Sequence, residues 1–222
     1  EDAFQDNTTI TSVTIPASVT EIGSNAFAGC TNLTSVNYIG DWSKLTIQSG
    51  NPAVEDAVNA QLFDFAFTPD NTAVIVTHYK GTAADVTIPS CYKGKPVMAI
   101  NNAAFPNSAV TSVTIPDSVT SIPDAAFVNC SQLTNISIPN SVTYIGFSAF
   151  DGCASLKSIT LPSSLRTIGN SAFAGCPSLM TVTYPGSKTQ WDAITKGSNN
   201  DVLENKLVCN QLEATFTADA FS

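Results

Sequence analysis

The sequence predicts a β-rich solenoid with short strands and little helix, built from turns of about 23 residues. Two internal repeats predict it. An Ala-Phe pair with a cysteine three residues after the phenylalanine recurs once per turn, as in Ala149-Phe150 and Cys153. A turn this short cannot enclose a core alone, so it must bury its apolar residues against neighbouring turns. An apolar residue followed by proline recurs every 23 residues, at Ile115-Pro116, Ile138-Pro139, Leu161-Pro162 and Tyr184-Pro185.

Each turn is expected to contain two short extended segments. In Val113–Ile115 and its equivalents, apolar and small polar residues alternate as in a half-buried strand. The proline that follows ends this strand, because proline has no N–H to donate to a ladder. Val119 and Ile122 predict a second extended segment, and Gly146 in the next repeat opens a turn that carries the Ala-Phe pair inward.

A longer period of 149 residues divides the chain into two arrays, so we expect a fragment of a longer tandem protein. We expect short helical or irregular array endings, because Val54, Val58 and Leu62 follow helical spacing. The predicted parts are residues 1–40 (last turns of a first array), 41–66 (array-ending segment), 67–100 (strand-and-turn start of the second array), 101–189 (its turns) and 190–222 (its ending).

The complete repeat unit reads Leu133-x-x-Ile136-x-Ile138-Pro139-x-Ser141-Val142-x-x-Ile145-Gly146-x-x-Ala149-Phe150-x-x-Cys153. This unit resembles the BspA-type leucine-rich repeat, also described from Treponema. The resemblance covers nearly the whole chain and implies a leucine-rich-repeat, right-handed superhelix from an extracellular or surface-anchored protein. Some members of that family are adhesins that bind host matrix or plasma proteins, and the family shares no catalytic residues. Because a repeat fold specifies a shape more surely than a partner, the implied partner is an analogy.

Composition excludes several classes of partner and chemistry. A net charge of −9, from 9 basic and 18 acidic residues, argues against nucleic acid and anionic membranes as partners. No apolar run reaches the ~18 residues needed to insert into a membrane. The only histidine, His78, has no nucleophile placed beside it, and no Cys-x-x-Cys pair suggests a metal site, so we predict no enzyme and no cofactor. We expect a ladder of buried free thiols at one shared repeat position: Cys30, Cys130, Cys153 and Cys176.

The outward positions of the predicted strands give the candidate binding surface. They form an uncharged face of short hydroxyl and amide side chains, which we term the hydroxyl face: Ser112, Thr114, Asn135, Ser137, Ser158, Thr160, Thr181 and Thr183. β-Propensity and solubility would also explain this composition. Trp42 and Trp191 are secondary candidates as sugar-stacking platforms, although their matched positions favour packing over the last turn.

We therefore predict a non-enzymatic extracellular or cell-surface protein that mediates adhesion or protein–protein interaction. Two alternatives stay open. One is a structural stalk that holds another domain away from the surface, which the tandem duplication suits equally well. The other is a carbohydrate-binding module, which would need Trp42 or Trp191 to be exposed to a glycan.

Overall fold

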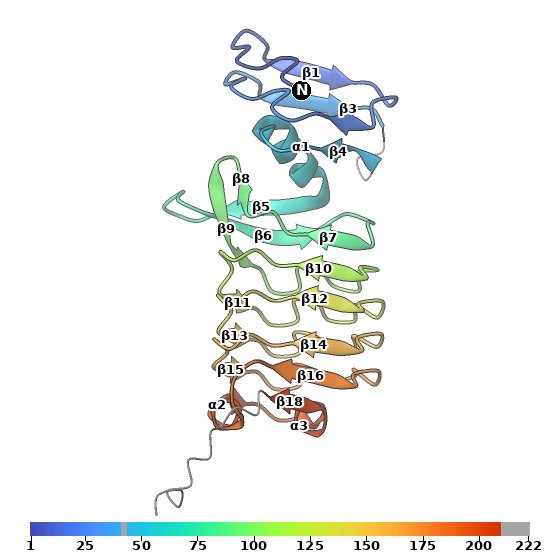
Figure 1. Cartoon of the computed structure of the whole chain (residues 1–222), viewed down its shortest axis with the longest axis vertical. Coiled ribbons are helices and arrows are strands. Elements are labelled where there is room, and N and C mark those ends of the chain that lie inside the picture. Colours follow the sequence, from blue (N-terminus) through green and yellow to red (C-terminus); the bar gives the residue numbers. More distant parts are fainter. Residues whose placement is uncertain (41–43, 210–222) are drawn as a thin grey trace, which may run out of the picture.

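The computed structural model describes residues 1–40 and 44–209, which form an elongated stack of turns with the N-terminus at one end (Figure 1). Two rows of short strands run along the stack, and the apolar side chains lie between them. The arrangement is a strand-rich, helix-poor repeat solenoid, as the sequence predicts.

The first row comes from the Val-x-Ile stretches. Neighbouring strands pair in parallel and in phase, so that Val113 lies opposite Ile136 on one side and Val86 on the other. The sheets in this row are β1-β3, β7-β10-β12 and β14-β16-β18. The strands are β1 (Ser12–Ile15), β3 (Ser35–Tyr38), β7 (Asp85–Thr87), β10 (Ser112–Thr114), β12 (Asn135–Ser137), β14 (Ser158–Thr160), β16 (Thr181–Tyr184) and β18 (Leu207–Cys209).

The second row of strands confirms the second extended segment expected in each turn, although these strands are shorter than the strands of the first row. Ile122 and Ile145 are paired and fully buried, whereas Val119 is buried just outside its strand. The sheets are β2-β4 and β11-β13-β15-β17. The strands are β2 (Glu21–Ile22), β4 (Thr46–Ile47), β11 (Ser121–Ile122), β13 (Tyr144–Ile145), β15 (Thr167–Ile168) and β17 (Thr195–Lys196).

A column of stacked phenylalanines fills the space between the rows. The ring centroids of Phe105 and Phe127 are 4.9 Å apart, those of Phe127 and Phe150 5.4 Å, and those of Phe150 and Phe173 5.1 Å. These rings are at most 1% exposed. The turns approach so closely that a Cβ on Gly169 would lie 2.6 Å from the backbone of the preceding turn, so this position requires glycine.

The two arrays do not form one uninterrupted stack. Helix α1 (Pro52–Leu62) lies between them, and the buried apolar residues form one cluster up to Val54 and another from Phe63 onward. A sheet of order β5-β6-β9-β8 then starts the second array. Its strands are β5 (Phe63–Phe67), β6 (Val74–Tyr79), β8 (Cys91–Tyr92) and β9 (Lys95–Ile100). β6 lies within residues 67–100, the predicted strand-and-turn start of the second array, whereas β5 crosses the predicted boundary between residues 66 and 67.

Each array ending centres on a buried asparagine at the same repeat position. The side chain of Asn200 accepts the N–H of Phe173 at 3.1 Å and donates to the carbonyls of Gly169 at 2.8 Å and Gly197 at 2.9 Å. Asn51 accepts the N–H of Phe27 at 2.9 Å in the same way. These amides satisfy backbone groups that another turn would otherwise have to satisfy.

The second ending, expected to be helical or irregular, contains two short helices, α2 (Lys188–Asp192) and α3 (Asp201–Asn205), and α2 begins two residues before the predicted boundary at residue 190. It then adds β17 and β18, one further strand to each row. The equivalent of β18 in the first array, residues 58–60, is instead part of α1. The sequence explains this difference, because Val-Asn-Ala is a poorer strand former than Leu-Val-Cys, and Ala57 and Ala60 favour the helix.

Candidate interaction surface

The structure brings the hydroxyl face together along one side of the second array. Val113, Ile136, Ile159 and Val182 are at most 5% exposed, so the residues that alternate with them point outward. Within the sheets, Ser112 lies opposite Asn135, and Ser158 lies opposite Thr181. β12 lies beside β14 in the stack, so the two sheets present adjacent parts of one face (Figure 1). Five of the eight residues are exposed; the half-buried ones are Ser112, Thr181 and Thr183.

The polar groups of this face are not used to hold the turns together. Among residues 1–40 and 44–209, no hydrogen bond within the chain engages the side chains of the hydroxyl face. The serines that follow the prolines behave differently, because Ser141 and Ser164 donate to the carbonyls of Val119 and Val142, both at 2.6 Å.

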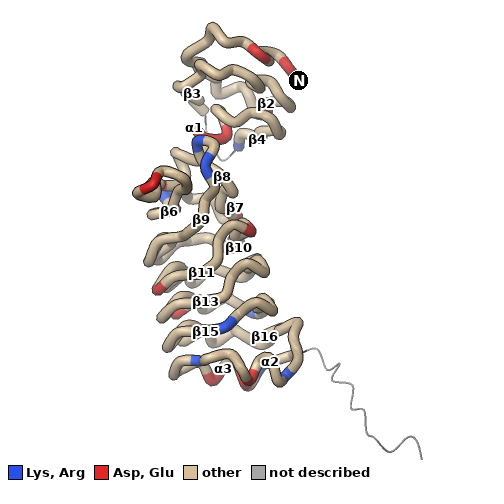
Figure 2. Tube along the Cα trace, turned by 90° about the vertical axis from the view of Figure 1, so that its left-hand side faces the viewer, with Lys and Arg blue, Asp and Glu red and all other residues tan. Residues whose placement is uncertain are grey.

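Charge is sparse over the whole stack. Figure 2 shows only scattered acidic and basic positions along the turns, and the eight residues of the hydroxyl face carry none. Asp85 lies on β7, opposite Ser112 of β10, and accepts a hydrogen bond from the Thr111 hydroxyl at 3.2 Å. The hydroxyl face therefore offers hydrogen-bonding groups and very little charge.

Trp191 is fully buried, which favours packing over a sugar-binding role. Its ring lies 5.4 Å from that of Tyr184, its Nε1 donates to Glu204 Oε1 at 2.9 Å, and Lys196 Nζ lies 4.7 Å from its centroid. These contacts use both the ring and its N–H, so no face is open to a glycan. Trp42, the other candidate platform, lies outside the described residues.

The predicted thiol ladder is buried, and its chemistry is structural. The Sγ atoms of Cys130, Cys153 and Cys176 donate to phenylalanine carbonyls of the preceding turn, at 3.0–3.3 Å. Burial raises the pKa of Cys130 to about 11 and that of Cys176 to about 12, and it also raises the pKa of Cys153. The thiolate is the reactive species, so these thiols are inert at neutral pH.

Other features of the described residues do not form a chemical site. No group of three or more His, Cys, Asp or Glu side chains in residues 1–40 and 44–209 could hold a metal ion. His78 is exposed on β6, opposite Asp64 of β5. In the same part of the chain, no helix has the length and apolar character to cross a membrane.

Comparison with known families decides what kind of repeat this is. A model of the BspA type leucine rich repeat region matches residues 1–49 and 85–198 in six copies. The chain belongs to the BspA-type leucine-rich repeat family. The unmatched segment between these ranges contains α1, β5 and β6, where the rows of this BspA-type protein are interrupted.

Two solved structures of bacterial leucine-rich repeat proteins are similar to this chain. A leucine-rich repeat protein from Bacteroides capillosus is 30% identical with a TM-score of 0.53, over 57% of this chain and 96% of that one. A leucine-rich cell surface protein from Faecalibacterium prausnitzii is 28% identical with a TM-score of 0.53, over 84% of this chain and 51% of that one. Comparison with functionally curated proteins finds no match.

The sequence predicted the outward residues but not the role of the buried asparagines. Asn51 and Asn200 are 149 residues apart and so occupy equivalent positions in the long repeat, yet their contacts with the neighbouring turn depend on the folded endings. Their equivalent positions in the two array endings are the signal that could have identified them.

Proposed function

We propose that this BspA-type protein is a non-enzymatic extracellular adhesion or protein-interaction module that binds a host or matrix protein through the hydroxyl face. The observation that carries the proposal is the repeated, uncharged array of outward hydroxyl and amide groups with no partner among the described residues. An extracellular location is supported by the resemblance to the F. prausnitzii cell surface protein.

The composition of this face favours weak, multivalent binding. It has no aromatic or arginine residue of the kind that dominates tight interfaces. Many arrays displayed together would raise the overall avidity without any new contact. The carbohydrate-binding alternative receives less support, because the ring of Trp191 is buried.

The stalk alternative is supported by the 149-residue duplication, which would lengthen a spacer equally well. Binding measurements separate the two functions. The chain and a covalently linked dimer of it would be tested against immobilised matrix and plasma proteins and mucin-type glycans at about 0.15 M salt, where long-range attraction is screened. Saturable binding that is stronger for the linked dimer is expected. Absence of binding by both proteins would reject adhesion and leave the stalk.

A further inference from the structure

The second row of strands carries two exposed aromatic side chains in a single turn, and we term them the aromatic pair. Tyr144 is 39% exposed and Phe147 is 53% exposed. In the parallel register of β11, β13 and β15, Tyr144 lies between Ser121 and Thr167 (Figure 2). Phe147 likewise has polar residues at its position in the turns before and after it. The repeat therefore does not require an aromatic residue at either position.

Both members of the aromatic pair contact the same carboxylate, so they lie close together. Asp124 holds the position of Phe147 in the preceding turn. Its Oδ1 accepts the N–H of Phe147 at 2.8 Å and the hydroxyl hydrogen bond of Tyr144 at 3.4 Å. Partial burial and the Asp124 carboxylate raise the pKa of Tyr144, which therefore stays protonated and donates at neutral pH.

Polar groups with no partner in the chain lie around the aromatic pair. Among residues 1–40 and 44–209, no hydrogen bond or ion pair engages Asp124 Oδ2, the Asn170 amide nitrogen or the Arg166 guanidinium. Asn170 follows Phe147 by one turn, and Arg166 directly precedes Thr167 of β15. Solvent reaches Asp124 Oδ2, because no buried side-chain oxygen of the described residues lacks a partner. The pair is therefore flanked by an acceptor in the preceding turn and by donors in the next one.

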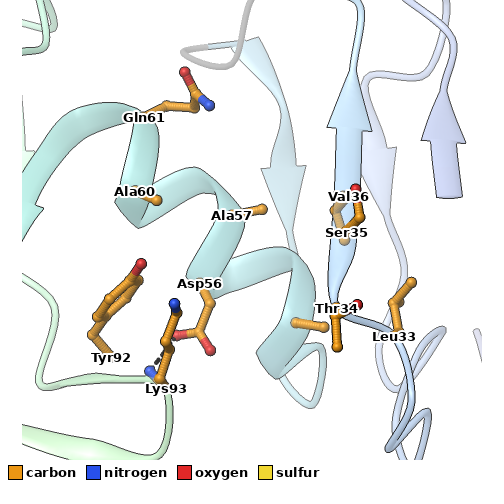
Figure 3. A pocket seen from close by; sticks show the side chains of 11 residues that line it. Leu33, Thr34, Ser35, Val36, Asp56, Ala57, Ala60, Gln61, Tyr92 and Lys93 are labelled. Atoms are coloured by element: carbon orange, nitrogen blue, oxygen red, sulfur yellow. Dashed lines mark hydrogen bonds between the residues drawn. The ribbon is translucent and has the colours of Figure 1, made fainter. Parts of the chain in front are cut away.

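A groove of about 550 Å³ between β3 and α1 does not offer this combination (Figure 3). Of the residues that line it, only Tyr92 is aromatic, and this side chain is buried. The Tyr92 ring stacks on Phe65 with the centroids 4.1 Å apart, and Lys93 Nζ lies 5.4 Å from its centroid. Asp56 in this groove already accepts the Lys93 N–H at 2.8 Å. The combination of exposed rings and unpartnered polar groups thus belongs to the second row, not to this groove.

We propose that the aromatic pair binds an uncharged hexopyranose residue of a glycan. The negative face of an aromatic ring attracts the C–H groups on the apolar face of a sugar ring, and polar groups beside the ring fix the sugar hydroxyls. Asp124 Oδ2 is placed to accept a hydrogen bond from one hydroxyl, and Asn170 is placed to donate to another. Asp124 and Arg166 carry opposite charges, so the site has no net charge, which suits an uncharged sugar.

A glycan fits this surface better than a protein does. Protein interfaces centre on clusters of apolar anchors that exclude water, whereas the positions beside Tyr144 hold the small polar residues Ser121 and Thr167. Two rings in a polar surround offer a contact for one sugar residue. This site lies on the second row, away from the hydroxyl face, so it adds to the proposed function and does not depend on it.

Titration of the isotope-labelled whole chain with lactose, cellotriose and triacetylchitotriose tests this proposal by NMR. At least one of these saccharides should cause saturable shifts of the amide signals of residues 145–148 and 168–170. Tyr144→Thr and Phe147→Asn introduce the residues found at these positions one turn later, so both variants should fold with an unchanged melting temperature. Each should weaken binding at least about fivefold, which is about 1 kcal/mol, and the double variant should show no saturable shift.

Met180→Thr is the matched control, because Met180 is 66% exposed beside the first row and Thr134 holds the same position two turns earlier. The affinity of this variant for the saccharide should change less than about twofold. No saturable shift with any of the three saccharides, or equal weakening by Phe147→Asn and Met180→Thr, would overturn the proposal.

The two binding surfaces can be tested separately. Thr114→Lys, Ser137→Lys and Thr160→Lys together should leave saccharide binding unchanged, because the hydroxyl face lies on the other row of strands. Loss of saccharide binding in that variant would also overturn the proposal. If the double variant at Tyr144 and Phe147 loses binding to a matrix or plasma protein while the unchanged chain binds no saccharide, the aromatic pair belongs to a protein contact and the proposal is wrong.

Discussion

Replacing Phe150 by alanine should destabilise the protein more than the same change at an end of the stack. Phe150 is fully buried, and its ring stacks on Phe127 at 5.4 Å and on Phe173 at 5.1 Å. A buried Phe→Ala change that also breaks two ring contacts costs about 4–5 kcal/mol. Because each turn contacts only its neighbours, the loss weakens the interfaces on both sides of this turn.

Phe4→Ala is the matched control, since Phe4 belongs to the equivalent column of the first array but is 45% exposed and stacks on one ring, Phe27, at 5.2 Å. Its loss should cost about 1 kcal/mol. Urea unfolding followed by far-ultraviolet circular dichroism measures both changes. With a slope of about 2–3 kcal/mol per molar urea, the midpoint should fall by roughly 1.3–2.5 M for Phe150→Ala and by no more than roughly 0.5 M for Phe4→Ala. Equal shifts for the two variants would refute the stacking argument.

Four further outcomes follow from the same structure. Asn200→Asp replaces two amide donors with a buried anion facing carbonyls and should cost about 3 kcal/mol or more by thermal unfolding; an unchanged melting temperature would contradict this. Ala125 has a φ of 53°, so Ala125→Gly should stabilise by about 1 kcal/mol, whereas Ala126→Gly should not. A thiol reagent at pH 8 should modify exposed Cys91 rapidly and the thiol ladder only on unfolding. Burial raises the pKa of the Cys130 thiol from 9.0 to about 11. The contribution of the buried, protonated thiol to the free energy of unfolding is therefore present below about pH 9 and is lost as the pH rises toward 11. A free energy of unfolding that stays constant across that range would contradict this prediction.

The regular turns could be predicted because each residue makes the same contact in every copy. Val113, Phe150 and Cys153 recur with a fixed spacing, so their burial, their stacking and the direction of their side chains follow from the period alone. The outward position of Thr114 follows from the alternation in β10.

The junction between the arrays could not be predicted in this way. Residues 58–60 and 207–209 occupy equivalent positions in the long repeat, yet one segment is helical and the other is β18. That outcome depends on local propensity and on the sheet β5-β6-β9-β8 that follows α1, neither of which is set by the period. The helical course of residues 58–60 beside β3 therefore appears only in the folded chain.

The most direct test of the interaction function is the effect of charge on the hydroxyl face. A variant with lysine at Thr114, Ser137 and Thr160 would be compared with one that has lysine at Thr120, Thr143 and Thr195, which are exposed on the second row of strands or beside it. Both variants have the same net charge, and their binding to a partner identified among matrix, plasma or mucin ligands would be measured at about 0.15 M salt. Loss of binding only in the first variant is the predicted result. Unchanged binding by the first variant, or equal loss in both, would contradict a binding site on the hydroxyl face.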